Sequence, residues 1–159
     1  MSIAAVKEYL KQFNLESKVE EFTQSSATVE LAAQAAGVIP ARIAKTLSFK
    51  VGDGAVLIVT CGDTKIDNAK YKAQFHTKAK MLTPEEVIEF TGHAIGGVCP
   101  FAITNENVTT YLDESMKRFD IMLPAAGSAN SCIRLTLDEL EKASKAKAWI
   151  DVCKLIEEA

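Results

Sequence analysis

The hydrophobic residues of this chain change their spacing several times, and each change predicts a different element. Apolar positions recur at helical spacing over residues 2–13, which predicts an amphipathic helix that ends near Asn14. Residues 46–49 and 55–60 are apolar runs on either side of the sequence Val51-Gly52-Asp53-Gly54. Two such runs around glycine and aspartate predict a β-hairpin.

Start and stop signals predict the remaining helices. Thr28, Asp67, Thr83 and Thr136 are each placed to cap a helix, and the last two are followed by a glutamate that completes a capping box. The predicted helices cover residues 29–36, 41–44, 68–75, 84–91 and 137–145, and the predicted strands cover residues 18–22, 79–82, 119–123 and 131–135. Residues 149–158 are expected to form a strand and a final helix.

Strands and helices therefore interleave along the chain, but a hairpin is also present. This combination predicts an α/β (α+β) fold in which helices surround a mixed, partly barrel-like β-sheet. The 159 residues are expected to form a single domain, residues 1–159, because a chain of this length supports one core.

Composition narrows the classes of function. Hydrophobic residues make up 48% of the chain and charged residues 25%, as in ordinary globular proteins. We expect a cytoplasmic protein without a membrane segment, because no stretch approaches the roughly 18 apolar residues of a membrane span and the first residues lack a signal-peptide core. The four cysteines are too scattered for a zinc or redox motif. The net charge of −3 argues against coating long nucleic acid, but it permits the binding of one nucleotide end.

Residues 92–102 combine a glycine pair, a cysteine and a proline without helical or strand spacing, which predicts a shaped loop. Gly96 and Gly97 allow the backbone to approach a ligand, and Pro100 fixes the direction in which the chain leaves. Backbone N–H groups gathered in such a loop can hold a developing oxyanion. A plain turn is the alternative. We call residues 92–102 the glycine loop.

Lys45 and Cys99 are the other candidates for chemistry. The ammonium group of Lys45 either stays in solvent or points into a pocket beside the glycine loop to bind a phosphate or a carbonyl. Cys99 and His93 invite a nucleophile and base interpretation, although six residues of loop fix no geometry between them. Two scattered histidines predict no metal site, and no Walker or dinucleotide-binding motif occurs.

Several short segments follow one another in order over about residues 20–142. They are Ala36-Gly37-Val38, Ile43-Ala44-Lys45-Thr46-Leu47, Gly62-Asp63, Gly96-Gly97-Val98-Cys99-Pro100-Phe101, Asp113-Glu114-Ser115, Ala126-Gly127, Ile133-Arg134-Leu135 and Glu139-Leu140. Taken together, these segments resemble the YbaK/ProX family of aminoacyl-tRNA deacylases. That family includes free-standing proteins and the editing domain inserted in bacterial prolyl-tRNA synthetase.

The resemblance implies a trans-acting enzyme that hydrolyses the ester of a mischarged tRNA, without cofactor, metal or covalent intermediate. Its partners would be the tRNA acceptor end and an aminoacyl-tRNA synthetase. The implied catalytic residues are Lys45, which engages the terminal adenosine or its phosphate, and the loop residues Gly96, Gly97 and Pro100. The implied substrate-binding residues are Phe22, Ser26, Thr28, Thr46, Val98, Cys99 and Gly127, with alanyl, cysteinyl, seryl and threonyl esters all open.

Two departures from the family pattern put the substrate in doubt. Ala102 stands where a glycine is common, and Ser128-Ala129-Asn130 lacks the usual basic residues. A non-catalytic module that holds a tRNA end or a synthetase is the first alternative, and a thiol hydrolase that uses Cys99 is the second. Either a tRNA-binding face or an ordinary solvated surface is expected from five lysines, Lys65, Lys70, Lys72, Lys78 and Lys80.

Overall fold

Four of the five longer helices begin at the predicted caps. The structure, a computed structural model, describes residues 2–156. Its helices are α1 (Ser2–Leu10), α2 (Val29–Ala36), α3 (Asn68–Phe75), α4 (Pro84–Thr91) and α5 (Leu137–Ser144). The side chains of Thr28 and Asp67 accept backbone N–H groups, and Thr83 and Thr136 each form a complete capping box. The chain passes from α1 into a 3₁₀ turn that ends at Asn14 in the left-handed region, so the predicted stop is confirmed.

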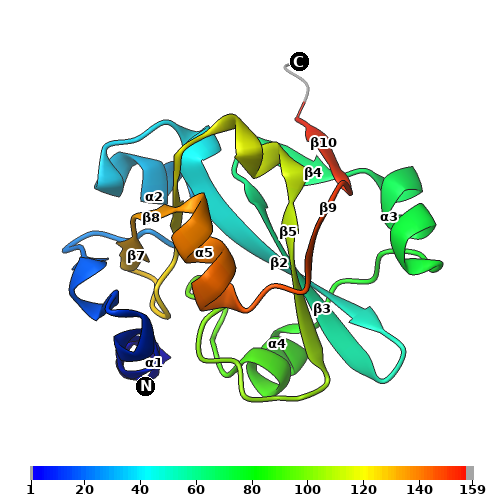
Figure 1. Ribbon diagram of the computed structural model, residues 1–159, viewed down its shortest axis with the longest axis horizontal. Coiled ribbons are helices and arrows are strands. Elements are labelled where there is room, and N and C mark those ends of the chain that lie inside the picture. Colours follow the sequence, from blue (N-terminus) through cyan, green and yellow to red (C-terminus); the bar gives the residue numbers. More distant parts are fainter. Residues whose placement is uncertain (1, 157–159) are drawn as a thin grey trace.

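The central sheet is mixed and curls into a half-barrel with the helices around it, as the sequence predicts (Figure 1). Its strand order is β8-β6-β2-β3-β5-β9, and two small sheets pair β1 with β7 and β4 with β10. The strands are β1 (Val19–Glu21), β2 (Ile43–Val51), β3 (Gly54–Cys61), β4 (Thr64–Ile66), β5 (Val108–Asp113), β6 (Ile121–Pro124), β7 (Ser131–Ile133), β8 (Leu135–Thr136), β9 (Ala148–Ile150) and β10 (Cys153–Leu155).

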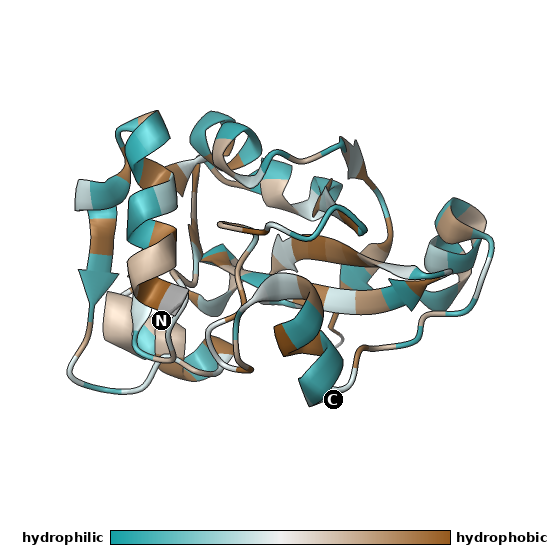
Figure 2. Ribbon diagram, turned by 90° about the horizontal axis from the view of Figure 1, so that it is seen from below, coloured by the Kyte–Doolittle hydropathy of each residue, from teal (hydrophilic) through white to brown (hydrophobic). Residues whose placement is uncertain are grey.

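The predicted hairpin is the centre of this sheet. Strands β2 and β3 pair antiparallel from Ala44 opposite Cys61 to Val51 opposite Gly54. Strand β3 is buried along almost its whole length because the sheet is covered on both faces, and this explains its continuous apolar run. Figure 2 shows apolar residues concentrated in the strands at the middle of the molecule.

Alternation along the hairpin separates two hydrophobic clusters. Val59 and Cys61 of β3 face the larger cluster, which includes residues of α1 and α5. Val56 and Ile58 face a second cluster built around Tyr71 of α3. Because successive side chains of a strand point to opposite faces, odd and even positions of β2 also face different surroundings.

Three expectations need correction. Residues 40–42 form a 3₁₀ turn and β2 starts at Ile43, so the expected helix over residues 41–44 is wrong. Of the strand expected over residues 79–82, only a single bridge between Met81 and Phe49 forms. Cys153–Leu155 is a strand paired with β4 instead of a helix, and its Cys153 side chain packs in the second cluster. Residues 157–158 of that expectation lie outside the described residues.

No helix within residues 2–156 combines the length and the apolar character that crossing a membrane requires.

Candidate functional site

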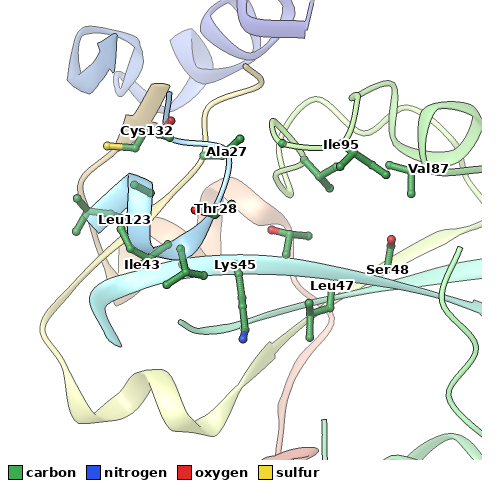
Figure 3. Close-up of a pocket in the computed structure, with 18 of the residues that line it drawn as sticks. Ala27, Thr28, Ile43, Lys45, Leu47, Ser48, Val87, Ile95, Leu123 and Cys132 are labelled. Carbon is green, nitrogen blue, oxygen red and sulfur yellow. The ribbon is translucent and has the colours of Figure 1, made fainter. Parts of the chain in front are cut away.

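A cavity of about 260 Å³ lies beside one edge of β2 (Figure 3). Strand β6 covers this edge only at Ile43 and Ala44, and the bridge to Met81 covers it again at Phe49. Between these contacts no strand within residues 2–156 pairs with β2 on this side, and the cavity occupies the gap. Its walls come from the start of α2, β2, α4, the glycine loop and β6. They include Ser26, Ala27, Thr28, Val29, Ala32, Ile43, Ala44, Lys45, Thr46, Leu47, Ser48, Met81, Leu82, Val87, Ile95, Gly96, Val98, Leu123, Ala125, Ser131 and Cys132.

The lining is mainly apolar but contains two hydroxyl groups without a partner. The Ser26 Oγ and Thr46 Oγ1 atoms are both buried, and neither atom forms a hydrogen bond within residues 2–156. Ser26 is held in place because its N–H donates to the carbonyl of Ala129 over 2.6 Å. Leaving a buried hydroxyl unsatisfied costs about 1–3 kcal/mol. The lining therefore contains hydrogen-bonding capacity that the described residues leave unused.

Lys45 contributes to the wall of the cavity, but its ammonium group points away from the glycine loop. In Figure 3 the side chain leaves β2 on the side opposite Ile95. Its Nζ donates to the carbonyl oxygens of Thr64 and, over 3.5 Å, of Gly62. Burial lowers the pKa of this ammonium group below its ordinary value. In this conformation a cation faces the turn between β3 and β4 instead of the pocket that the sequence led us to expect.

Hydrogen bonds at its start and within it shape the glycine loop. Helix α4 ends where Gly92, in the left-handed region, donates its N–H to the carbonyl of Ile88. The His93 Nε2 atom lies 2.7 Å from the Phe101 carbonyl oxygen and must be the donor, because a carbonyl only accepts. The Gly97 N–H donates to the Ala94 carbonyl over 3.0 Å. That N–H is consequently not available as an oxyanion donor in this conformation.

Gly97 also lies against a second loop. A Cβ atom at this position would lie 2.8 Å from the Ser128 nitrogen and 2.9 Å from the Gly127 carbonyl carbon. The two loops therefore approach each other through bare backbone, which positions Gly96 at the cavity wall.

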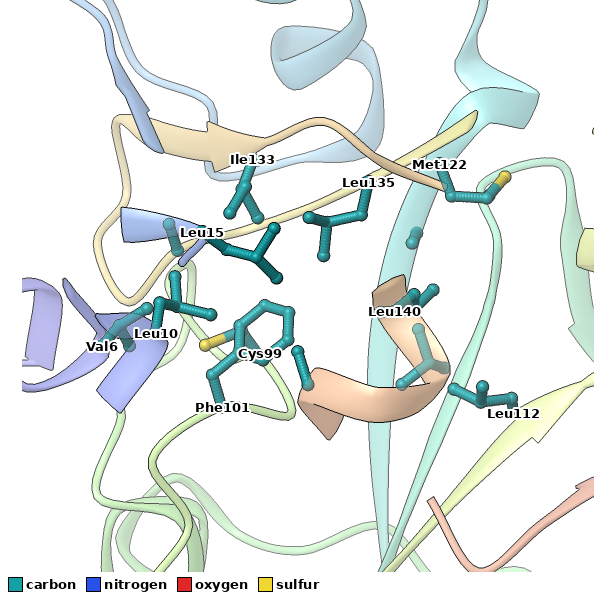
Figure 4. Packing of buried hydrophobic residues seen from close by; sticks show 14 of the residues in the cluster. Val6, Leu10, Leu15, Cys99, Phe101, Leu112, Met122, Ile133, Leu135 and Leu140 are labelled. Carbon is teal, nitrogen blue, oxygen red and sulfur yellow. The ribbon is translucent and has the colours of Figure 1, made fainter. Parts of the chain in front are cut away.

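The structure brings His93 and Cys99 together, with 3.5 Å between Nε2 and Sγ, but away from the cavity. The Cys99 side chain is fully buried, and Figure 4 shows it beside Phe101 and Leu10 in the larger cluster. Burial raises the pKa of its thiol to about 12. The Cys99 thiol lies in the core and not in the lining of the cavity, and this geometry argues against the thiol hydrolase alternative.

Of the residues named from the sequence, six line the cavity: Ser26, Thr28, Lys45, Thr46, Gly96 and Val98. Gly97 and Gly127 lie behind the loop, and Cys99 is in the core. Pro100 borders a separate depression with Tyr9, and Phe22 packs against a cluster around Leu123. The cavity does not include these five.

The sequence analysis missed Ser48 and Ser131, two further hydroxyl residues in the lining. Ser48 is two positions from Thr46, so strand alternation alone could have placed it on the same side. Ser131 lies far from β2 in the chain, and no local signal would have found it.

The lysines proposed as a tRNA face are all exposed. Lys70 forms an ion pair with Asp151 at 3.0 Å. Lys65 of β4 lies directly opposite Lys154 of β10, so two like charges stand side by side on this small sheet. Within residues 2–156 no group of three or more histidine, cysteine or acidic side chains is arranged to hold a metal ion.

Comparison with known proteins gives a family match over most of the chain. The sequence profile of the family described as "Aminoacyl-tRNA editing domain" matches residues 23–143. An uncharacterized protein of Bacillus subtilis, YwhH, is 54% identical over 155 residues, which cover 97% of this chain and 98% of that protein. A proline–tRNA ligase of a Thermotoga species is 30% identical over 98 residues, which are 61% of this chain but only 17% of the ligase.

The fold is shared with solved structures as well. A crystal structure described as "a putative trans-editing enzyme for prolyl tRNA synthetase" aligns with a TM-score of 0.86 and 32% identity, and covers 96% of this chain and 97% of that one.

Proposed function

The chain belongs to the aminoacyl-tRNA editing domain family, and on that premise we propose that it is a trans-acting deacylase that hydrolyses the ester of a tRNA charged with a wrong, small amino acid. The names of two relatives concern prolyl-tRNA synthetase. We therefore take tRNA charged by that synthetase as the first substrate to test, and the cytoplasm as the place of action.

The observation that carries the proposal is the cavity beside β2 with its two unpartnered hydroxyl groups. A volume of about 260 Å³ is below the roughly 300–1,000 Å³ of sites for drug-sized ligands, which favours a small group. Apolar walls with Ser26 and Thr46 suit a short side chain and a few polar atoms. Alanyl, seryl, cysteinyl and threonyl esters all meet this description.

Editing by a second pocket has a physical reason. One methylene group is worth only about 1–3 kcal/mol of discrimination, so a synthetase cannot reject a slightly smaller amino acid by binding alone. A separate cavity that admits only small groups removes such errors after charging.

In the proposed reaction a water molecule adds to the ester carbonyl carbon. The bond to the ribose oxygen then breaks, and that oxygen leaves with a proton, so the products are the free amino acid and the uncharged tRNA. Gly96 at the cavity wall positions the ester, and hydrogen-bond donors at the wall stabilise the charge on the carbonyl oxygen. Lys45 binds a phosphate of the tRNA end when its ammonium group exchanges the carbonyls of Gly62 and Thr64 for that anion.

Two observations favour a second candidate, a non-catalytic module that holds the tRNA end. The Lys45 ammonium group is directed away from the cavity, and the Gly97 N–H is already bonded to Ala94. A protein with this arrangement could bind the acceptor end without hydrolysing its ester.

A panel of mischarged tRNAs separates these functions. We expect the purified protein to cleave at least one small aminoacyl ester faster than buffer does. Lys45→Ala should lower kcat/KM by about 10- to 100-fold, because a hydrogen bond to a charged group contributes about 1.5–3 kcal/mol. Lys142→Ala serves as the matched control, because Lys142 lies on α5 outside the cavity. Binding of the tRNA without turnover would instead support the second candidate, and cleavage by Lys45→Ala at the parental rate would contradict the role of Lys45.

A further inference from the structure

The main chain of β2 presents an unused pair of hydrogen-bonding groups to the cavity. Even-numbered residues of β2 direct their N–H and C=O groups to the cavity edge, as two contacts show. The Ser48 carbonyl accepts the Leu82 N–H over 3.2 Å, and the Lys50 N–H donates to the Lys80 carbonyl over 2.8 Å. Because strand geometry repeats every two residues, the N–H and C=O of Thr46 point to the same edge.

No protein partner meets Thr46 at this edge. Strand β6 pairs with β2 only as far as Ala44, the bridge to Met81 begins at Phe49, and no strand within residues 2–156 lies between them. The opening faces the mainly apolar cavity, where the Thr46 Oγ1 atom also lacks a partner. A donor and an acceptor left unpaired beside this cavity match a ligand with the opposite groups.

An aminoacyl ester carries those groups at the spacing of a peptide residue. Its α-amino nitrogen donates, its carbonyl oxygen accepts, and one carbon separates them, as in a residue of a neighbouring strand. In an antiparallel ladder two opposed residues exchange both N–H···O bonds. Peptide ligands add to exposed sheet edges in this way, with the main chain supplying the affinity.

We propose that the aminoacyl group docks on Thr46 as a one-residue strand. The α-ammonium group donates to the Thr46 carbonyl, and the ester carbonyl oxygen accepts from the Thr46 N–H. This inference rests on the proposed function. It identifies the Thr46 N–H, at the edge of β2, as the donor that polarises the scissile carbonyl, since the Gly97 N–H is already bonded to the Ala94 carbonyl. The contact requires a free α-amino group and is independent of the side chain of residue 46.

Removing one N–H group tests the contact. The Thr46 amide is changed to an ester by introducing the α-hydroxy acid analogue of threonine, which keeps the side chain and deletes the donor. We expect kcat/KM on the cleaved aminoacyl-tRNA to fall by about 100-fold, in the range found for the loss of one oxyanion donor. The melting temperature should stay near that of the parent, because this N–H faces no strand.

The same exchange at Lys50 is the matched control for stability, since its N–H is bonded to the Lys80 carbonyl and its loss should lower the melting temperature. Should the ester variant fail to fold, the substrate comparison below tests the contact, because it leaves the protein unchanged.

The substrate supplies the second arm. Alanyl-tRNA is compared with propionyl-tRNA, its counterpart without the α-amino group, or seryl-tRNA with 3-hydroxypropionyl-tRNA if the panel selects seryl. We expect the acceleration over buffer to drop at least about tenfold for the des-amino ester. Either of two results would overturn the docking on Thr46 and leave the deacylase function intact. One is equal acceleration of the two substrates. The other is parental activity of the protein with the Thr46 backbone ester while Lys45→Ala is impaired. If the parent cleaves no ester of the panel, the proposed function fails first.

Discussion

Replacing His93 by glutamine should remove a pH-dependent part of the protein's stability. The imidazole is 1% exposed, and its Nε2 donates to the Phe101 carbonyl over 2.7 Å. Burial lowers the pKa of His93 below the ordinary value of about 6.5, and the carbonyl opposes this only in part. The folded state therefore holds the imidazole neutral, whereas the unfolded state takes up a proton near pH 6.5.

The sign and size of the effect follow from proton linkage. The contribution of the neutral imidazole is fully present above pH 6.5 and is lost as the pH falls from there towards the pKa of the folded state. The slope approaches about 1.4 kcal/mol per pH unit when only the unfolded state is protonated. Between pH 6.5 and 5.5 the parent should lose up to about 1 kcal/mol of unfolding free energy through this group.

Glutamine is the informative substitution because its terminal amide can donate to the Phe101 carbonyl but does not titrate. The free energy of unfolding of parent and His93→Gln is measured in urea at pH 5.5, 6.5 and 7.5. Titrating groups that both proteins share cancel in the difference between their unfolding free energies. This difference should narrow by up to about 1 kcal/mol on acidification. Parallel pH profiles for the two proteins would refute a buried neutral His93.

Three other substitutions probe the loops and the helix before them. Cys99→Ala should keep kcat/KM within about threefold in the deacylation assay but lower the unfolding free energy by about 1–2 kcal/mol, because it leaves a small core cavity. Gly97→Ala should cost about 1–3 kcal/mol, measured by urea unfolding, since the new Cβ would lie 2.8 Å from the Ser128 nitrogen; unchanged stability would show that the loops can part freely. Thr83→Ala removes the cap of α4 and should lower the melting temperature by about 2–4 °C, the equivalent of about 1 kcal/mol.

Local signals account for the parts of the fold that the sequence predicted. The caps at Thr28, Asp67, Thr83 and Thr136 act within four residues, and the β2–β3 hairpin is specified by its own turn. The helix predicted for the C-terminal segment is wrong for the opposite reason. Cys153 pairs with Ile66, which is far away in the chain, and this long-range pairing makes the segment a strand.

The candidate site shows the same division. The sequence supplied the residue types around Lys45 and Gly96, but the cavity exists because β6 leaves β2 after Ala44 and Met81 rejoins it at Phe49. Neither contact has a local signature. Phe22 and Cys99 were assigned to the pocket by resemblance, and long-range packing places them against Leu123 and in the core.

The alternation of β2 also limits what kind of ligand can use both Lys45 and Thr46. Adjacent residues of a strand point to opposite faces, so the two side chains cannot contact the same small group. In Figure 3 the Lys45 side chain projects on the face opposite Ile95. The Thr46 main chain instead faces the strand edge that the Ser48 and Lys50 contacts define. A ligand that reaches both must pass around the free edge of the strand. In the proposed substrate the aminoacyl group is joined to a terminal nucleotide, so the acyl part would lie at the edge while a phosphate reaches the face of Lys45.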